Sequence, residues 1–331
     1  MTNKTILITG GTGSWGLELV TQLLKEQPKE IRIFSRNESL QVQMRQKIGD
    51  PRLKFIIGDI RDKAEMTMAC SGVDEVYHLA ALKHVPICEN QPESALKTNI
   101  IGTQNVIDAA IENHVRKVMY VSTDKAVNPT NTYGMTKAIG EKLIIYANGR
   151  SNTRFACFRS GNVLGTAGSV VPLFKEQLNE GRNLSVTDPG MTRFFLTLED
   201  AVRILLTAME NIFTGEIFVA KMAACRITDL AQVLINHSKS KQTKIHYVGI
   251  RSGEKLHETL ITESEISRVN DIHDQYFIIT PEDTKDSLGV NEIQLYDARR
   301  GYHSEDYMMS LKEIEQLLHR GGFIGCNEEL C

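Results

Sequence analysis

The sequence lacks any hydrophobic run of the ~20 residues that a membrane-spanning helix needs. Its first residues lead straight into a predicted strand, without the features of a signal peptide. Basic residues (38) nearly balance acidic residues (41) with no polybasic segment, so nothing favours nucleic-acid binding. The six cysteines lie far apart and form no CxxC pair, which is typical of free thiols in a reducing compartment. We therefore expect a cytoplasmic protein without a metal site and without membrane or nucleic-acid partners.

Short apolar runs alternate with helical segments through residues 4–159, a pattern typical of a Rossmann-type, doubly wound parallel α/β sheet. The second half is less regular. We predict a dinucleotide-binding domain over residues 1–165, which also receives parts of about 192–222, and a smaller mixed α/β substrate lobe over 166–331. Ligands of such sheets bind at the carboxyl ends of the strands, so the site is expected there.

The second half also carries local signals for individual helices. Thr228 is predicted to cap a helix that ends at Ile235, and a further helix is predicted over Gly253–Ile261. Ser310 and Glu313 form a predicted capping box, while residues 282–308 are polar and irregular.

A glycine-rich turn, Gly10-x-x-Gly13-x-x-Gly16, lies between the first predicted strand and an amphipathic helix. Gly10 permits the tight turn, Gly13 the approach of a pyrophosphate, and Gly16 the close packing of the helix. The amino end of that helix favours an anion. The predicted cofactor-binding residues are Gly10, Thr12, Gly13, Ser14, Trp15, Gly16, Ser35, Arg36, Asp59, Ile60, Ala80, Ala81, Lys83, Asn99, Tyr133 and Lys137.

The end of the second predicted strand indicates which dinucleotide binds. An NAD site usually carries Asp or Glu there for the ribose hydroxyls, but this chain has Ser35-Arg36. An arginine stacks on adenine and pairs with a 2′-phosphate, so NADP is predicted rather than NAD; the alternative is a solvated surface arginine. Asp59 is expected to accept the adenine amino group beneath a cover of Ile60, and the small Ala80 and Ala81 to admit the second ribose.

The stretch Ser122-Thr123-Asp124-Lys125 follows the apolar strand Lys117–Val121, and Tyr133 and Lys137 follow on a helix at i and i+4. These two side chains share one helix face above the strand end. The Lys137 ammonium and a nicotinamide ring are expected to lower the pKa of the Tyr133 phenol, so that it takes a proton from a substrate hydroxyl. Thr123 is expected to hydrogen-bond the same oxygen.

These motifs resemble the extended short-chain dehydrogenase/reductase family, and the similarity to UDP-N-acetylglucosamine 4,6-dehydratases of bacterial glycan synthesis covers the chain to about residue 281. The motifs that carry it are Ala80-Ala81-Leu82-Lys83-His84-Val85-Pro86, Lys97-Thr98-Asn99, Ser122-Thr123-Asp124-Lys125-Ala126, Gly161-Asn162-Val163, Gly168-Ser169-Val170-Val171-Pro172, Met191-Thr192-Arg193-Phe194 and Gly249-Ile250-Arg251-x-Gly253-Glu254-Lys255-x-His257-Glu258. Ser160 departs from the resemblance, because such enzymes usually carry tyrosine there.

The resemblance implies C4 oxidation, loss of water across C5 and C6, and hydride return to C6, for surface glycan synthesis. Asp124 as a carboxylic acid would protonate the departing C6 hydroxyl, and Lys125 as a neutral amine would take the C5 proton. Both roles need displaced pKa values. Retention and inversion at C5 both stay open.

The same resemblance implies a UDP-N-acetylglucosamine site without metal. Arg193 and Arg251 would pair with the diphosphate, and Asn162 with a phosphate or the sugar. Glu254 would bind the ribose, Thr187 and Val171 would line the uracil pocket, and Lys83 and His84 would contact the acetamido sugar.

Two other functions are compatible with the residues. A UDP-N-acetylhexosamine 4-epimerase needs Tyr133 but not the Asp124–Lys125 pair, and a non-catalytic NADP-sensing protein needs neither. The resemblance also implies a homo-oligomer, a dimer or larger, formed through apolar faces on the helices that carry Asn99 and Tyr133.

Overall fold

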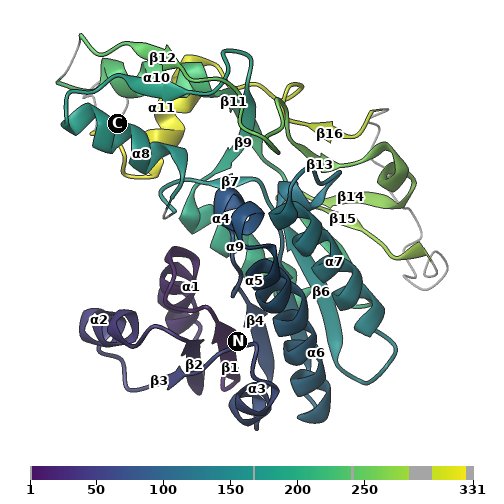
Figure 1. Cartoon of the computed structure of the whole chain (residues 1–331). Helices are drawn as coiled ribbons and strands as arrows, with labels where there is room; N and C mark the ends of the chain where they lie inside the picture. Colours follow the sequence, from purple (N-terminus) through teal and green to yellow (C-terminus); the bar gives the residue numbers. More distant parts are fainter. Residues whose placement is uncertain (1, 167, 240–241, 283–299, 326–331) are drawn as a thin grey trace.

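A nine-stranded sheet forms the centre of the computed structural model, which describes residues 2–166, 168–239, 242–282 and 300–325 (Figure 1). The strand order is β14-β15-β10-β6-β5-β4-β1-β2-β3. The strands from β10 to β3 run parallel to one another. β15 pairs antiparallel with β10, and β14 pairs antiparallel with β15. The parallel part of the sheet confirms the predicted Rossmann-type fold. The bounds are β1 Thr5–Thr9, β2 Glu30–Ser35, β3 Leu53–Ile57, β4 Glu75–His78, β5 Lys117–Val121, β6 Arg154–Arg159, β10 Ile217–Ala220, β14 Val269–His273 and β15 Tyr276–Ile279.

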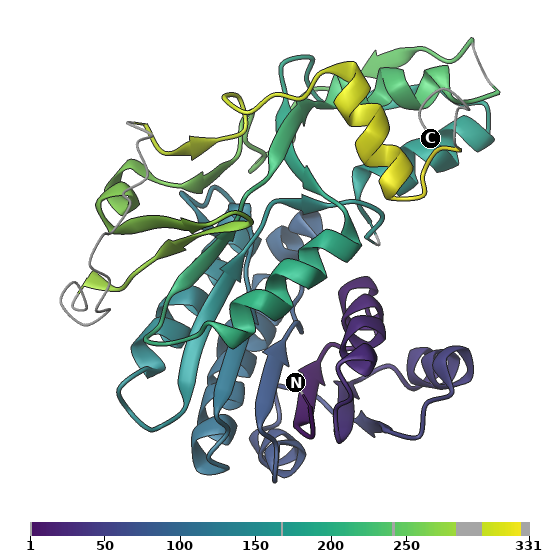
Figure 2. The same ribbon diagram turned by 180° about the vertical axis from the view of Figure 1, so that it is seen from behind.

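Helices cover both faces of this sheet, because its central strands are buried on both sides. α3, α6 and α7 pack side by side over one face, and α1 and α9 pack together over the other (Figures 1 and 2). The bounds are α1 Ser14–Lys25, α2 Glu38–Ile48, α3 Lys63–Cys70, α4 Val85–Asn90, α5 Pro92–Leu96, the π-helical η1 Lys97–Ile101, α6 Gly102–Glu112, the 3-10 turn η2 Asp124–Ala126, α7 Thr132–Ala147 and α9 Leu198–Glu210.

The smaller lobe is built from short sheets and three helices around an apolar core of its own, with Phe174, Leu230 and Leu318 at its centre. β7 Asn162–Val163, β9 Thr192–Leu196 and β11 Ala223–Arg226 form one sheet, and β8 Leu184–Val186 pairs with β12 Ile245–Tyr247. β13 Thr259–Ile261 pairs with β16 Tyr302–His303, and the buried residues of this pair pack in the main core. The helices are α8 Val170–Asn179, α10 Ile227–Asn236 and α11 Leu311–Arg320, with a 3-10 segment, η3 Glu263–Arg268.

Three expectations need correction. Gly253–Ile261 is not a helix: it is a loop that ends in β13, because its carbonyls accept hydrogen bonds from distant side chains such as Asn131 and Arg193. α10 begins at Ile227, and its N-cap is Arg226 rather than Thr228. The sheet takes β14 and β15 as well as β10, a contribution from residues 269–279 that the predicted division did not include. The Ser310–Glu313 capping box is confirmed.

None of the helices in the described ranges is both long and apolar enough to cross a membrane. Cys70, Cys88, Cys157 and Cys225 are buried and unpaired; the remaining two cysteines, and most of the predicted irregular segment 282–308, lie outside the described residues.

Candidate active site

Two cavities meet at the carboxyl ends of the central strands. The first, about 540 Å³, lies over the glycine-rich turn and is called the sheet-end cavity here. The second, about 270 Å³, lies between η2 and the smaller lobe and is called the lobe cavity. Lys125 and Asn162 line both, so the two form one continuous site. Tyr133, Lys137, Lys83, His84, Ala80, Ala81 and Ser160 line the first; Thr187, Arg193, Arg251 and Glu254 line the second.

The glycine-rich turn has the geometry of a pyrophosphate cradle. Gly10 has a φ of +68°, and a Cβ there would lie 2.8 Å from the Ala80 Cα. A Cβ on Gly16 would lie 2.1 Å from the Gly11 carbonyl oxygen, so the helix can approach this closely only with glycine. Gly13 caps α1 without a side-chain hydrogen bond and the first turn carries no acidic residue, so no carboxylate there repels an anion at this helix end. These residues fit a dinucleotide.

The residues predicted for the adenosine end lie at the ends of β2 and β3. Asp59 forms ion pairs with Arg61 and, at 3.9 Å, with Arg36, whose side chain is 54% exposed. The Ser35 hydroxyl accepts a hydrogen bond from Gln41. Ile60 is buried in the main core against Gly102 and lines neither cavity. Arg36 is therefore an exposed cation at the end of β2, as Arg61 is beside β3, whereas Ile60 contributes to packing.

Asn99 is buried in η1 and lines neither cavity. Its amide accepts from the Leu82 N–H at 2.8 Å and donates to the Leu82 carbonyl at 2.9 Å and to the Thr136 hydroxyl at 2.9 Å. Thr136 in turn donates to the carbonyl of Tyr133. Asn99 thus connects the loop after β4 with the helix that carries Tyr133.

The Tyr133–Lys137 pair differs from the sequence expectation in its electrostatics. Burial lowers the pKa of Lys137 to about 7; its Nζ donates to the Val121 carbonyl at 2.6 Å and lies 3.8 Å from the centre of the Tyr120 ring. Burial raises the pKa of Tyr133 to about 12, and within the chain Lys125 is the charge that lowers it. Among the charged side chains of the protein, Lys125 and not Lys137 lowers the pKa of Tyr133, so the expectation for Lys137 is wrong.

Replacing Lys137 with methionine should abolish activity yet raise the free energy of unfolding by about 1–2 kcal/mol, since a buried amine is removed. Between pH 7 and 10.5 the unfolded chain binds a proton that folded Lys137 has lost, so this group makes native stability rise with pH. That rise should disappear in the variant. Chemical denaturation at several pH values tests this, with the exposed Lys142→Met on the same helix as control. A variant less stable than the native chain would contradict it.

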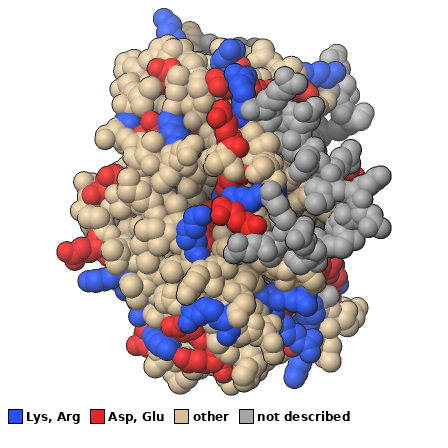
Figure 3. Space-filling model, turned by 90° about the vertical axis from the view of Figure 1, so that its right-hand side faces the viewer, with Lys and Arg blue, Asp and Glu red and all other residues tan. Residues whose placement is uncertain are grey.

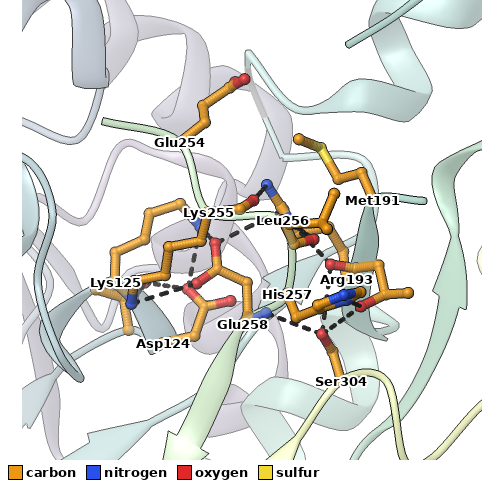
Figure 4. Close-up of polar contacts among 12 residues, drawn as sticks. Asp124, Lys125, Met191, Arg193, Glu254, Lys255, Leu256, His257, Glu258 and Ser304 are labelled. Carbon is orange, nitrogen blue, oxygen red and sulfur yellow. Dashed lines mark hydrogen bonds and ion pairs between the residues drawn. The ribbon is translucent and has the colours of Figure 1, made fainter. Parts of the chain in front are cut away.

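Asp124 and Lys125 form an ion pair on η2, in which the Lys125 side chain is 24% exposed and lines the two cavities (Figure 4). Asp124 is fully buried, and its Oδ1 accepts from Lys125 Nζ at 3.0 Å and from the Thr123 hydroxyl at 2.9 Å. Lys125 Nζ also lies 3.5 Å from Oε1 of Glu258. Burial lowers the pKa of Lys125, but the two carboxylates outweigh it and hold the pKa above its ordinary value. The predicted neutral amine is therefore corrected: Lys125 is an ammonium in this arrangement.

The residues predicted for the sugar nucleotide lie at different depths. Arg193 is buried and donates to the carbonyls of Thr192, Lys255 and Leu256. Arg251 has a 61% exposed side chain, 4.0 Å from Glu254. Arg251 is thus the accessible cation, and Arg193 ties the loop 253–258 to β9.

The apolar wall of the lobe cavity also differs from the prediction. Val171 is 1% exposed and packs in the core of the smaller lobe, whereas its neighbour Val170 lines the cavity, because successive residues of α8 face different ways. The Thr187 hydroxyl donates to the sulfur of Met191. His84 packs against Gly168.

Sequence reasoning missed Glu258 and Lys255, which both line the lobe cavity. Both stand in the motif Gly253-Glu254-Lys255-x-His257-Glu258, but two of the cations around Glu258, Lys125 and Arg193, come from distant segments, so the local sequence holds no signal for this arrangement. Within the described residues, no group of three or more His, Cys, Asp or Glu side chains could hold a metal ion.

Comparisons with known proteins agree with this arrangement. The profile of the family described as "Polysaccharide biosynthesis protein" matches residues 6–281. The chain is 46% identical over 283 residues to a UDP-N-acetylglucosamine 4,6-dehydratase (inverting) of Campylobacter jejuni, covering 84% of this chain and 83% of that one. It is 43% identical over 329 residues to a UDP-glucose 4-epimerase of Rickettsia rickettsii, covering 96% and 95%.

Among solved structures, that of Pen from Bacillus thuringiensis superposes with a TM-score of 0.88 at 37% identity, covering 96% of this chain and 99% of that one. With a profile match over most of its length, and a cradle for a dinucleotide below a Tyr133–Lys137 pair, the chain belongs to the polysaccharide biosynthesis protein family within the extended short-chain dehydrogenases/reductases.

Proposed function

We propose that the protein is an NADP-dependent UDP-N-acetylglucosamine 4,6-dehydratase that forms a UDP-2-acetamido-2,6-dideoxy-hexos-4-ulose for surface glycan synthesis. The observation that carries this proposal is the ion pair between the buried Asp124 and the partly exposed Lys125, 3.0 Å apart, where the two cavities meet. A 4-epimerase has no use for a second acid–base pair beside Tyr133. The likeness to the Campylobacter jejuni dehydratase supports the same reaction.

Oxidation at C4 is the first step. A dinucleotide held by the glycine-rich turn would supply the hydride acceptor and later the hydride donor. Tyr133 lines the sheet-end cavity beside Thr123 and takes the proton of the C4 hydroxyl. Because burial raises the pKa of Tyr133 to about 12, this role requires additional positive charge next to the phenol, which an oxidised nicotinamide ring carries.

Water loss is the second step, and it needs Asp124 as the acid and Lys125 as the base. Transfer of one proton across the 3.0 Å contact, from Lys125 Nζ to Asp124 Oδ1, produces both forms without exchange with solvent. The 4-ketone acidifies C5, and Lys125 takes its proton. The C5–H electron pair forms the C5=C6 bond while the C6–O bond breaks, and Asp124 protonates the leaving hydroxyl.

Incubation with UDP-N-acetylglucosamine, followed by mass spectrometry, tests the proposal. Loss of one water supports it. An unchanged mass with formation of UDP-N-acetylgalactosamine would instead establish the epimerase, the second candidate, which the similarity to UDP-glucose 4-epimerases favours. No conversion would favour a non-catalytic NADP-sensing protein. NMR of the product in deuterated water distinguishes retention from inversion at C5, and the likeness to an inverting enzyme favours inversion.

NADP is proposed as the cofactor because Arg36 is an exposed cation where the 2′-phosphate would lie. Replacing Arg36 with aspartate should weaken NADP binding by about 10- to 100-fold, the size of a hydrogen bond to a charged group, and improve NAD binding. Calorimetric titration with both dinucleotides measures this. Arg61→Ala, which removes the other partner of Asp59, is the control and should not change the preference. Unaltered NADP affinity in Arg36→Asp would contradict the assignment.

We further propose a cytoplasmic homo-oligomer. Large apolar side chains are exposed along α5, η1 and α7, and a second copy of the chain would cover them; they are Leu96, Ile101, Met135, Ile139 and Tyr146. Light scattering on the purified protein gives the number of copies.

A further inference from the structure

Glu258 is a buried carboxylate surrounded by cations. It is 2% exposed and stands directly before β13, at the end of the loop that lines the lobe cavity. Its carboxylate lies 3.5 Å from Lys125 Nζ, 3.6 Å from Arg193 Nε and 3.7 Å from Lys255 Nζ (Figure 4). Its N–H donates to the Ser304 hydroxyl at 2.9 Å, which fixes the backbone. The carboxylate therefore faces three cations from three segments of the chain.

The contacts of Glu258 differ from those of a carboxylate that is buried only to complete the fold. Glu216, which is 3% exposed, accepts hydrogen bonds from the N–H groups of Phe213 and Thr214 at 3.1 and 2.7 Å. The Oε2 of Glu258 has no hydrogen-bond partner among the described residues, and its cations lie beyond hydrogen-bond distance. Burying a carboxylate in this way is costly, so the charge itself is the feature to explain.

We propose that Glu258 is a positioning residue for the water-loss step: it holds Lys125 Nζ beside Asp124 and stabilises the ammonium that forms when Lys125 takes the C5 proton. This inference rests on the proposed dehydratase function. A negative charge 3.5 Å from the amine makes that amine a stronger base, which is what removal of a carbon-bound proton demands.

The charges around Glu258 are consistent with this role. Lys125 faces it from η2 with Asp124 behind, Arg193 faces it from β9, and Lys255 belongs to its own loop. His257 is turned elsewhere, towards the Thr192 hydroxyl and Glu305. Arg193 and Lys255 offset the negative charge of Glu258, and of the three cations around it only Lys125 lines both cavities. The loop 253–258 thus places the Glu258 carboxylate beside Lys125, the proposed base.

The first test needs no turnover. Competitive acetylation with trace acetic anhydride across a pH series, read by mass spectrometry, reports the reactivity of Lys125. In Glu258→Gln, Lys125 should react about tenfold faster at a fixed alkaline pH, because it loses its proton at lower pH. Glu216→Gln, the matched buried carboxylate, should leave Lys125 unchanged. Glu258→Asp keeps the charge one methylene further away and should give an intermediate rate, and it serves if the glutamine variant does not fold.

The second test is kinetic. In Glu258→Gln, kcat for water loss should fall about 10- to 100-fold with KM little changed, and the pH profile of kcat should move. Oxidation at C4, followed by the absorbance of reduced nicotinamide, should keep its rate. If Lys125 labels identically in the native chain and Glu258→Gln, the inference is overturned. If the native chain loses no water from the substrate, the proposed function fails instead, and the labelling still decides whether Glu258 controls Lys125.

Discussion

Replacing Lys125 with alanine is expected to slow water loss by about 10²–10⁴-fold, the usual contribution of a positioned base. The substitution removes the group that takes the C5 proton and leaves buried Asp124 and Glu258 without their shared cation. C4 oxidation uses Tyr133 as its base and loses only the Lys125 charge that lowers the pKa of Tyr133, so it should slow less than water loss, and reduced nicotinamide and the 4-ketone should accumulate. Mass spectrometry measures the missing water loss, absorbance measures the oxidation, and calorimetry should show that NADP still binds.

Lys125→Arg is the matched control for this experiment. A guanidinium keeps a positive charge between Asp124 and Glu258 but stays protonated in proteins, so it preserves the electrostatics without supplying a base. It should fold as the native chain does and remain inactive in water loss. Native rates of water loss in either variant would show that Lys125 is not the base of this step.

The largest expected effect on stability belongs to Arg159, which lies on β6 behind the site. Its guanidinium binds Glu141 of α7 and Glu265 of η3, with closest distances of 2.8 and 3.0 Å, and donates to the Leu260 carbonyl at 2.8 Å. Arg159 is 3% exposed. Arg159→Met leaves the buried carboxylate of Glu141 without its cation and removes the cation from the partly buried Glu265, so it should lower the free energy of unfolding by about 3–5 kcal/mol. Urea denaturation measures this loss.

The deficit of the Arg159 variant should also depend on pH. Burial raises the pKa of Glu265, but Arg159 outweighs that effect and holds the pKa below its ordinary value. The stabilisation is therefore present above the ordinary pKa of 4.5 and is lost as the pH falls through the native pKa, so the two proteins should become more alike in acid. Arg203→Met, which breaks an exposed pair with Asp200, is the control and should cost less than about 1 kcal/mol. A loss in the free energy of unfolding of less than about 1 kcal/mol for Arg159→Met would contradict the stabilising role of Arg159.

The features that were predictable from the sequence are those fixed by near neighbours along the chain. Gly10 adopts a positive φ because the turn after β1 requires it, and Tyr133 and Lys137 share a helix face because they are four residues apart. The alternation of buried strands and helices likewise predicts the parallel sheet.

The features that escaped prediction depend on partners far along the chain. Glu258 meets Lys125 across more than a hundred residues, and Arg193 reaches the carbonyls of the loop 253–258 that periodicity presented as a helix. The raised pKa of Lys125 has the same origin, because an Asp-Lys dipeptide alone does not reveal a second carboxylate. The spacing of residues along the sequence does not reveal contacts between distant segments.

β10 and β15 lie beside β6 in the sheet but are synthesised much later, which has a consequence for folding on the ribosome. β6 carries the fully buried Phe155 and Phe158, and its free edge is covered only when Ile217–Ala220 emerges, in turn covered by Tyr276–Ile279. At about 5–20 residues per second, the nascent chain exposes an apolar, unpaired sheet edge for several seconds. Until β10 pairs with β6, this edge can serve as a template for pairing with another chain.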